Sequence, residues 1–407
     1  MSDVHWSDWS EAGREAPWTV GVEEEVMLLE PRAWGLDSRS DEVLAALPED
    51  MQGRTAAETH GSALELATAP QPRIADAAAE LCELRSGLAA VLEPLGIRAA
   101  VAGTHPFTLW EDIEVSPGAR YQFLYSSMRE LARREPTFGL HVHVAVPNPE
   151  QAVRAYNRVR AHLPMLLALS GNSPFWQGRD TGLSSMRTPL FQAFPRVGIP
   201  RMFRSYAEYV ESIDLLLRCD AFPEPTFLWW DVRLQPRFGT LEVRVMDAQT
   251  RVADTAALAA LVQCLVHMEA LEGYASHMLV SRPEVLEENR FIAARDGMEA
   301  RFVDPETERR RPAREWLDEL LDACAPHAAD LGCSDELGTI RALSEATGAA
   351  RQRRAHAVEH IGVGRRRAAP TGTGCGSATA RPSRTAGSRS STSPSAARSR
   401  WSTRSSG

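Results

Sequence analysis

The sequence contains no lysine, so all 45 of its basic residues are arginines. This absence excludes a Schiff-base lysine, a Walker-A lysine, a lysine nucleophile for adenylate transfer and a carbamylated lysine between two metals. Any phosphate or carboxylate that the chain binds must therefore be held by arginine, by metal ions or by backbone N–H groups.

Closely spaced cysteines and long apolar runs are also missing. The six cysteines are scattered without a C-x-x-C pair, which predicts reduced thiols in a cytoplasmic protein and no structural zinc site. No apolar run approaches the roughly 18–20 residues of a membrane span, and residues 1–18 are too polar and acidic for a signal peptide. We therefore expect no membrane partner, and we expect residues 1–18 to be a loose leader.

The last part of the chain lacks acidic residues. From residue 361 onward there are nine arginines and no Asp or Glu, so residues 1–360 carry 45 − 9 = 36 arginines against 54 acidic residues, a balance of −18. An acidic body argues against nucleic acid as a partner. The Arg/Ser/Gly-rich segment 361–407 has almost no apolar side chains, and we predict that it is disordered. It is either a basic interaction arm or, as we favour, the product of a reading-frame change in a GC-rich gene.

Carboxylates occupy the middle of a strand-like segment, residues 19–29. Alternate side chains of a strand share a face, so Glu23 and Glu25 point one way and Glu24 points the other. We assign Glu24 to the surface. Carboxylates about 7 Å apart on one face repel each other unless a cation lies between them. The alternative is the solvated face of an antiparallel sheet.

Three further segments predicted as strands carry side chains that can bind metals or phosphates. These are Glu65 in residues 62–68, His141 and His143 in residues 138–146, and Glu242 and Arg244 in residues 239–247. In one sheet these side chains would form a polar face, and unpaired buried charges cost several kcal/mol each. Such a face is either exposed or wrapped around cations, and carboxylate-rich sites suit Mg²⁺ or Mn²⁺ better than zinc. Two or more such ions imply a polyanionic ligand, most simply nucleotide phosphates.

Helical periodicity accounts for most of the remaining chain, with helices predicted over residues 74–92, 118–134, 149–169 (interrupted at Pro164), 203–219, 256–280, 283–300 and 312–324. Residues 170–198 show no clear periodicity. Ordered loops of this length are usually functional. His143 remains open between a role in the site and a purely structural hydrogen bond.

Five motifs, in this order along residues 19–350, resemble those of the type 2 glutamate–cysteine ligases, also called carboxylate–amine ligases. They are GVEEE (21–25), LELAT (64–68), GLHVHV (139–144), LSGNSPFWQGRDTG (169–182) and GTLEVRVMD (239–247). The resemblance implies an α+β fold like the catalytic domain of glutamine synthetase. In that fold a curved antiparallel sheet cups Mg²⁺ and ATP and is backed by helices.

The resemblance also implies an ATP-dependent ligase domain over residues 19–360. Family members phosphorylate a carboxylate, typically the γ-carboxylate of glutamate, and pass the acyl group to an amine, typically that of cysteine. Small amino acids are then the partners; which acid and amine are used, and whether the chain forms a homo-oligomer, remain open. Residues 170–198 would be a lid that keeps water from the acyl phosphate.

The resemblance assigns roles to residues of this chain where they match the motifs of the family. The resemblance implies that Glu23, Glu25, Glu65, His141 and Glu242 bind two or more Mg²⁺ (or Mn²⁺) ions or lie beside them. Glu242, Arg244 and Arg187 would be catalytic, with Arg244 on the transferring phosphoryl group and Arg187 on a phosphate or a substrate carboxylate. Arg244, Arg233 and His143 would contact ATP.

Other functions remain as alternatives. A metal-dependent hydrolase of the amidohydrolase type would alternate strands with helices and often needs a bridging lysine. A non-catalytic nucleotide-binding protein of the same fold would not need so many metal-binding side chains. A guanidino-phosphotransferase would need more arginines on the strands than Arg233 and Arg244.

Overall fold

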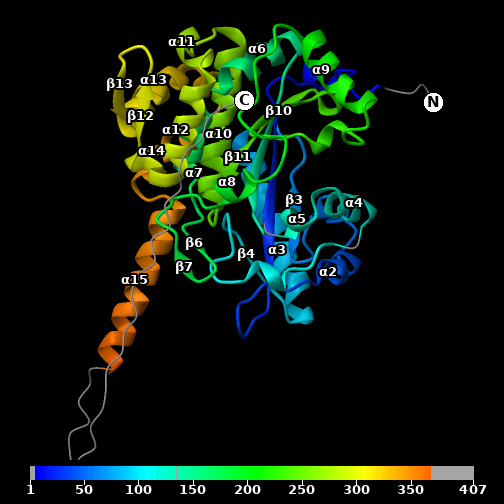
Figure 1. Cartoon of the computed structure of the whole chain (residues 1–407), viewed down its shortest axis with the longest axis vertical. Coiled ribbons are helices and arrows are strands. Elements are labelled where there is room, and N and C mark those ends of the chain that lie inside the picture. Colours follow the sequence, from blue (N-terminus) through cyan, green and yellow to red (C-terminus); the bar gives the residue numbers. More distant parts are fainter. Residues whose placement is uncertain (1–4, 117, 134–135, 368–407) are drawn as a thin grey trace, which may run out of the picture. The chain divides into compact units, whose positions relative to one another are not determined.

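A seven-stranded antiparallel sheet forms the centre of the molecule (Figure 1). The computed structural model describes residues 5–116, 118–133 and 136–367, with residues 133 and 359–367 described by backbone alone. The strand order is β10-β11-β5-β1-β3-β2, and β4 pairs with β1. The strands are β1 (Val20–Leu29), β2 (Thr55–Ala57), β3 (Ala63–Ala67), β4 (Arg98–Ala100), β5 (Gly139–Ala145), β10 (Val232–Gln235) and β11 (Thr240–Asp247).

The two faces of this sheet differ in chemistry. One face carries fully buried aliphatic side chains such as Val22, Val142 and Val243, which belong to the main hydrophobic core. The other face carries the glutamates and histidines. This alternation follows from the two-residue repeat of a strand. The helices that complete the core include α3 (Ile74–Leu95), α6 (Pro149–Val159), α7 (Leu163–Ser170), α10 (Val252–Leu271), α12 (Pro283–Asp296), α13 (Ala313–Leu331) and α14 (Ser334–Glu345). The predicted α+β class, an antiparallel sheet backed by helices, is confirmed.

The central helix is α10, which packs against α3, α6, α13, α14 and β5. Within the part of the chain that the structure describes, it is the one helix long and apolar enough to cross a membrane. However, 89% of its apolar window is buried inside the protein. Its apolar surface is therefore covered by the protein's own helices and sheet.

Several predicted helices are split. The helix predicted over 149–169 breaks at residues 160–162, just before Pro164. The helix predicted over 118–134 becomes α4 (Ala119–Met128) and α5 (Glu130–Arg133), with Arg129 between them at φ +55°. The helix predicted over 256–280 becomes α10 and α11 (His277–Val280). The remaining elements are α1 (Ala12–Glu15), α2 (Ser40–Ala46), α8 (Arg187–Phe191), α9 (Tyr206–Arg218), α15 (Gly348–Arg367), β6 (Phe175–Trp176), β7 (Arg179–Asp180), β8 (Val197–Gly198), β9 (Trp229–Trp230), β12 (Arg301–Asp304) and β13 (Arg309–Pro312).

The N-terminal segment is packed against the body, and the expectation of a loose leader is wrong for residues 5–18. The indole N–H of Trp6 donates to Asp214, and that of Trp9 donates to the carbonyl of Val146. Both indoles pack against the hydrophobic core. The expectation was based on the polar composition of this segment. Its tryptophans, however, supply the apolar surface that packs against the body of the protein.

The chain divides into two units, Met1–Glu359 and His360–Gly407, and everything described below lies in the first. The tail predicted to be disordered begins at residue 361. Residues 361–367 belong to α15, and residues 368–407 lie outside the described part of the chain.

Candidate active site

Neighbouring strands bring the predicted polar residues together in facing pairs on one side of the sheet. In the pairing of β1 with β5, Glu23 lies opposite His141, and in the pairing of β1 with β3, Glu25 lies opposite Glu65. Directly opposite residues in an antiparallel pair have Cβ atoms about 5 Å apart. The structure therefore brings together Glu23 and His141, which are 118 positions apart in sequence, and Glu25 and Glu65, which are 65 − 25 = 40 positions apart.

The next strand continues the pattern. Glu242 on β11 lies opposite His143 on β5 and opposite Arg233 on β10. A β-bulge between Val243 and Met246 then shifts the register by one residue. Because of this extra residue, Asp247 pairs with Gly139 and shares its face of the sheet.

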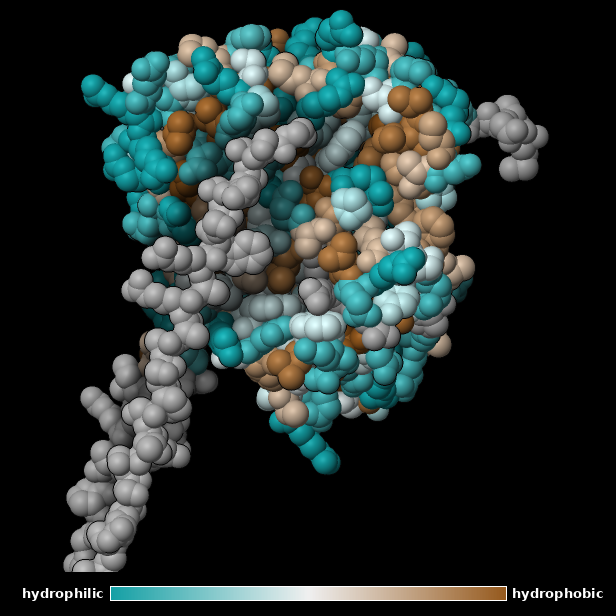
Figure 2. Space-filling view, viewed as in Figure 1, coloured by the Kyte–Doolittle hydropathy of each residue, from teal (hydrophilic) through white to brown (hydrophobic). Residues whose placement is uncertain are grey.

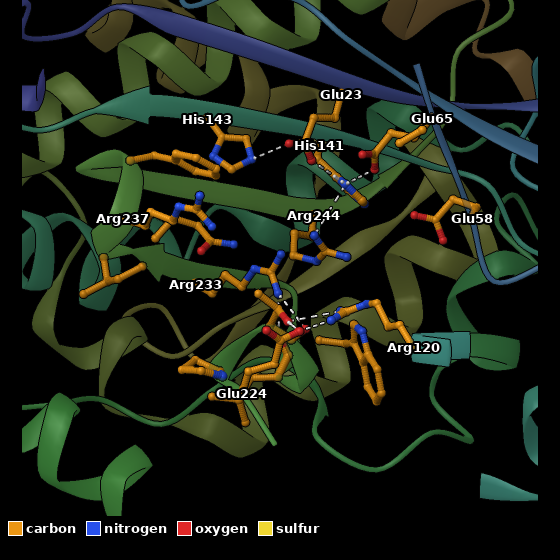
Figure 3. A pocket seen from close by; sticks show the side chains of 18 of the residues that line it. Glu23, Glu58, Glu65, Arg120, His141, His143, Glu224, Arg233, Arg237 and Arg244 are labelled. Atoms are coloured by element: carbon orange, nitrogen blue, oxygen red, sulfur yellow. Dashed lines mark hydrogen bonds and ion pairs between the residues drawn. The ribbon is translucent and has the colours of Figure 1, made fainter. Parts of the chain in front are cut away.

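Among the residues that the structure describes, two groups of side chains have the spacing of metal ligands. The first is Glu23, His141 and Glu242, and the second is Glu25, Glu65 and His141, with the donor atoms of each group within 4.8 Å of one another. His141 belongs to both groups (Figure 3): its Nδ1 lies 3.3 Å from Glu23 and its Nε2 lies 3.7 Å from Glu25. All five residues predicted to bind metal are thus members of these groups.

Glu242 is fully buried and is held by cationic neighbours. Arg233 donates to its carboxylate at 2.5 and 3.2 Å, Arg244 donates to it as well, and Gln235 donates at 2.8 Å. Burial opposes the charged form, but the two guanidinium groups outweigh it and hold the pKa of Glu242 well below its ordinary value. Glu242 is therefore ionised at neutral pH.

At the end of the site that contains Glu25 and Glu65, the pKa values of the carboxylates are raised instead of lowered. Burial, together with the nearby charge of Glu58, raises the pKa of Glu25 to about 7. Burial and the charges of Glu23, Glu58 and Glu25 raise the pKa of Glu65 well above its ordinary value. These carboxylates crowd one another in a region with too few cationic side chains. A bound cation would relieve that repulsion.

The pKa values of the two histidines are shifted in opposite directions. Burial, with the nearby charge of Arg244, lowers the pKa of His141 to about 4, so its ring is neutral and keeps a lone pair for a metal. Burial also disfavours the charged form of His143, but Glu23 and Glu242 outweigh it and raise the pKa of His143. The Nδ1 atom of His143 is hydrogen-bonded to Thr240 at 3.0 Å, and its Nε2 lies 3.3 Å from Glu23.

The donor set fits divalent cations that prefer oxygen ligands. Each group supplies two carboxylates and one imidazole, a composition suited to Mg²⁺ or Mn²⁺. The Nε2 atom of His141 is buried without a hydrogen-bond partner in the described part of the chain. Unpaired buried polar atoms are rare and need an explanation, and a ligand is one.

Arg187 reaches the site from the segment predicted to be a loop. It begins α8, and its guanidinium donates to the carbonyls of Arg244 and Val245 at 3.3 Å. Its Nε is buried without a hydrogen-bond partner among the described residues. A Cβ atom at Gly139 would lie 2.6 Å from Arg187 Nη2 and 2.9 Å from His141 Nε2, so any larger residue here would force one or both of these side chains to move.

Asp247 anchors the segment that carries Arg187. It accepts hydrogen bonds from the backbone N–H of Asn172 at 2.8 Å and from the hydroxyls of Ser173 and Ser185 at 2.7 and 2.8 Å. Ser173 in turn accepts from the backbone N–H of Arg187 at 3.1 Å. Much of the predicted lid is therefore fixed to the sheet. Asp247 lies within one of the five motifs, but no role was predicted for it from the sequence.

Two more residues were missed or misplaced by sequence reasoning. Glu58 follows the three-residue strand β2 and lines the site, but a strand this short leaves no readable alternation. Glu24 was assigned to the surface, which is wrong: it is fully buried and forms an ion pair with Arg85 of α3. Its face of the sheet is covered by helices, so the charge requires a buried partner.

Most of the site residues line a cavity of about 1160 Å³; they are Glu23, Glu25, Glu58, Glu65, His141, His143, Arg187, Arg233 and Arg244. Its walls also include Tyr209 of α9 and Tyr121 of α4, and Figure 2 shows apolar side chains gathered over the region between these helices. Beside the charged floor the cavity is thus partly apolar. This combination is typical of small-molecule sites.

The fold and this cavity define a class: α+β proteins in which an antiparallel sheet presents clustered carboxylate, imidazole and guanidinium groups to a deep pocket. Within it, the chain belongs to glutamate–cysteine ligase family 2, whose family model matches residues 19–369. The resemblance drawn from the five motifs is therefore confirmed.

Bacterial relatives match along most of their length. Two are proteins of Rubrobacter xylanophilus that carry the provisional names glutamate–cysteine ligase 2-1 and 2-3. The first is 40% identical over 337 residues, covering 83% of this chain and 89% of the relative. The second is 42% identical over 346 residues, covering 84% of this chain and 93% of the relative.

Solved structures share the fold at low identity. A bifunctional glutathione synthetase from Pasteurella multocida matches with a TM-score of 0.63 and 15% identity, over 83% of this chain and 50% of that protein. A glutamate–cysteine ligase from Francisella tularensis in complex with AMP matches with a TM-score of 0.59 and 12% identity, over 83% of this chain and 84% of that one. At such identities the likeness shows the fold alone.

Proposed function

We propose that this protein is an ATP-dependent carboxylate–amine ligase that joins glutamate to cysteine through an acyl phosphate. One observation carries the proposal: two groups of metal-competent ligands share His141, and Arg244 reaches both, lying within 3.4 Å of His141 and ion-paired with Glu242. Clustered cations and arginine neutralise the charge that moves during phosphoryl transfer. No lysine and no covalent protein nucleophile are required.

The five predicted ligands would hold the Mg²⁺ ions: Glu23 and Glu242 in one group, and Glu25 and Glu65 in the other. His141 lies in both groups but would bind an ion in only one of them, because a neutral imidazole has one free lone pair. When bound, Mg²⁺ supplies charge neutralisation for the ATP phosphates and orients them. Arg233 contributes indirectly, because its guanidinium donates to Glu242 and to the carbonyls of Thr226 and Leu228. It positions Glu242 as a ligand more than it contacts ATP.

The reaction has two steps. An oxygen of the substrate carboxylate attacks the γ-phosphorus of ATP, and the bond to ADP breaks. The neutral amine of the second substrate then attacks the acyl carbon, phosphate leaves with the electrons of the C–O bond, and the amine loses a proton. Arg244 would hold the phosphoryl group during transfer, and Arg187 would hold a phosphate or a substrate carboxylate, since its Nε lacks a partner within the described residues.

Water must be kept from the acyl phosphate. The segment that contains Arg187 is tied to Asp247 and forms part of the cavity wall. Arg120 of α4 closes another side, because it is ion-paired with Glu224 and donates to Thr226 at 3.1 Å. These contacts would limit solvent access while both substrates are bound.

Support for the substrates comes from the family. Its name and the names of its provisionally assigned members specify glutamate and cysteine. The described side chains supply arginines for carboxylates but do not by themselves select cysteine over another amine. The five cysteines in the described part of the chain are free, and together with the acidic body they agree with a cytoplasmic enzyme that binds neither nucleic acid nor a membrane.

An isotope experiment tests the proposal. Glutamate labelled with ¹⁸O in its γ-carboxylate is incubated with the protein, MgATP and cysteine, and the products are analysed by mass spectrometry. The proposal predicts γ-glutamylcysteine and the transfer of one ¹⁸O atom per turnover into inorganic phosphate. Amide formation with unlabelled phosphate would exclude the acyl phosphate, and labelled phosphate with another amine would change the substrate but keep the chemistry.

A further inference from the structure

A buried arginine outside the cavity connects the two elements that carry Arg187 and Arg244. Arg290 lies on α12, and its Nε and Nη2 atoms donate to the carboxylate of Asp231 at 2.5 and 3.2 Å. Its Nη1 atom donates to the side-chain oxygen of Gln192 at 2.6 Å. Arg290 and Asp231 are buried, and these two residues and Gln192 lie outside the lining of the cavity. Any effect that they have on a reaction in the cavity must therefore pass through other residues.

Asp231 is linked to Arg244 through the backbone. It directly precedes β10, and its carbonyl accepts from the backbone N–H of Arg244 at 2.8 Å. Arg244 lies at the bulge of β11, where the pairing with β5 shifts its register. A bulge interrupts the ladder locally, so the hydrogen bond to Asp231 helps to determine the position of Arg244. The side chain of Arg244 points into the cavity (Figure 3).

Gln192 is linked to Arg187 through a short helix. It is the C-cap of α8, the five-residue helix that Arg187 begins. A helix this short is not stable by itself, so its position depends on contacts with its surroundings. At the other end of α8, the guanidinium of Arg187 donates to the carbonyls of Arg244 and Val245 at 3.3 Å. These contacts close a ring, whose members in order are Arg187, Arg244, Asp231, Arg290 and Gln192.

A glycine in β8 leaves room for this arrangement. Gly198 has φ +96°, and a Cβ atom there would lie 3.4 Å from Gln192 Nε2 and 3.5 Å from its Oε1. Such a backbone conformation favours glycine. The carbonyl of Gly198 also accepts from the backbone N–H of Asp231 at 3.0 Å. The same residue thus contacts both hydrogen-bond partners of Arg290.

Stability alone does not account for an arginine at position 290. Replacing a buried ion pair by apolar side chains of similar volume is often neutral or stabilising. The planar guanidinium, however, carries five N–H donors in a fixed arrangement. One side chain can therefore hold the carboxylate of Asp231 and the amide oxygen of Gln192 at a defined separation.

We propose that Arg290 is a positioning residue for the reaction in the cavity: by holding Gln192 and Asp231 together, it sets the distance between the guanidinium groups of Arg187 and Arg244. This inference rests on the proposed function, because it concerns the two arginines that would hold the anionic groups of that reaction. It gives the end of α8 an influence on the rate, although this end lies outside the cavity.

Gln192→Ala tests the link, because it leaves the buried pair of Asp231 and Arg290 intact. We expect kcat for the ligation of glutamate and cysteine to fall about tenfold or more, since a displacement of about 1 Å can cost roughly 100-fold. KM should change less than kcat, because misaligned groups weaken binding of the transition state more than binding of the substrates. Arg290→Lys should also lower kcat, because an ammonium group keeps the charge beside Asp231 but loses the planar fork.

A double variant separates positioning from a general structural effect. In Arg187→Ala the guanidinium that Gln192 would position is absent, so adding Gln192→Ala should lower kcat no further. Gln52→Ala is the matched control and should keep the kcat of the wild type. Gln52 is also an exposed glutamine at the end of a short helix, where its side chain donates to the carbonyl of Leu47, the C-cap of α2, at 3.1 Å. Thermal melts show that each variant is folded.

The possible outcomes distinguish the two proposals. A Gln192→Ala variant with the kcat of the wild type, or losses of kcat that add up in the double variant, overturns the inference and leaves the ligase proposal in place. A wild-type protein without ligase activity overturns the ligase proposal, and the inference with it.

Discussion

Glu25 and Glu65 lie directly opposite each other across the β1–β3 ladder, and the pKa of each is raised. Like charges in this position destabilise a sheet. A strand pair selected only for stability would not place two half-buried glutamates there. The pair is explained if a cation between them is part of the working protein.

Glu65→Gln should therefore separate activity from stability. The substitution removes one of two repelling carboxylates, so the melting temperature of the metal-free protein should stay the same or rise. Ligase activity should fall by roughly 100-fold or more, because losing a group that only supports a metal ligand already costs roughly 10–100-fold. Differential scanning fluorimetry and a product assay on the same preparation measure both quantities.

Stabilisation by Mg²⁺ provides the control for that variant. The wild type and a surface variant, Glu93→Gln, should melt at a higher temperature when Mg²⁺ is added, and Glu65→Gln should show a smaller rise. Equal rises in all three proteins would show that Glu65 does not contribute to cation binding.

Cation binding should release protons near neutral pH. The pKa of Glu25 is raised to about 7 from 4.5, so between these values the folded metal-free protein holds a proton that the unfolded chain has lost. This contribution to stability falls as pH rises through about 7, and a cation must displace the proton. Apparent Mg²⁺ affinity should thus increase from pH 6 to pH 8. Calorimetry in two buffers of different ionisation enthalpy measures the released protons, and stronger Mg²⁺ binding at pH 6 would contradict the expectation.

Gly139→Ala should damage the site more than the fold. Its Cβ would overlap Arg187 and crowd His141, and displacing catalytic groups by about 1 Å can cost roughly 100-fold in rate. We expect such a fall in kcat with about 1–3 kcal/mol of lost stability. Gly21→Ala is the matched control on the neighbouring strand, because its Cβ would meet only His143 Cβ at 3.8 Å. Equal kcat values for the two variants would show that Arg187 and His141 tolerate the shift.

The buried pair of Glu24 and Arg85 should matter for stability alone. Arg85 donates to Glu24 and to the carbonyls of Gln249 and Thr250, so Arg85→Met leaves a buried charge unpaired and should cost about 3 kcal/mol in urea unfolding. Arg73→Ala, which removes an exposed ion pair with Asp76 at the start of the same helix, should change stability by less than about 1 kcal/mol. A similar loss in both variants would mean that Glu24 finds another partner.

The alternation of polar and apolar residues in β1, β5 and β11 was enough to predict the shared polar face, because the two-residue repeat is a local property. Glu58 was missed since β2 is too short to show that repeat. The position of Glu24 was misjudged because helices cover its face, and only the tertiary structure shows which face of an acidic strand is covered.

The segment around Arg187 shows a second limit. Its residues lack periodicity because side-chain hydrogen bonds to Asp247 determine its shape, and Asp247 faces the site only through the bulge in β11. The packing of residues 5–18 against the body likewise depends on individual tryptophan contacts, and these produce no periodic pattern in the sequence. Long-range contacts of this kind leave no pattern in the local sequence.

The most direct test of the account is the dependence of ADP release on each component of the reaction. Purified protein is supplied with ATP, Mg²⁺, glutamate and cysteine, each is omitted in turn, and ADP and amide product are measured together. The account predicts that ADP and γ-glutamylcysteine appear in equal amounts, and that omitting Mg²⁺ or cysteine stops formation of the amide. Release of ADP that continues without glutamate, or amide formation that continues without Mg²⁺, would contradict it.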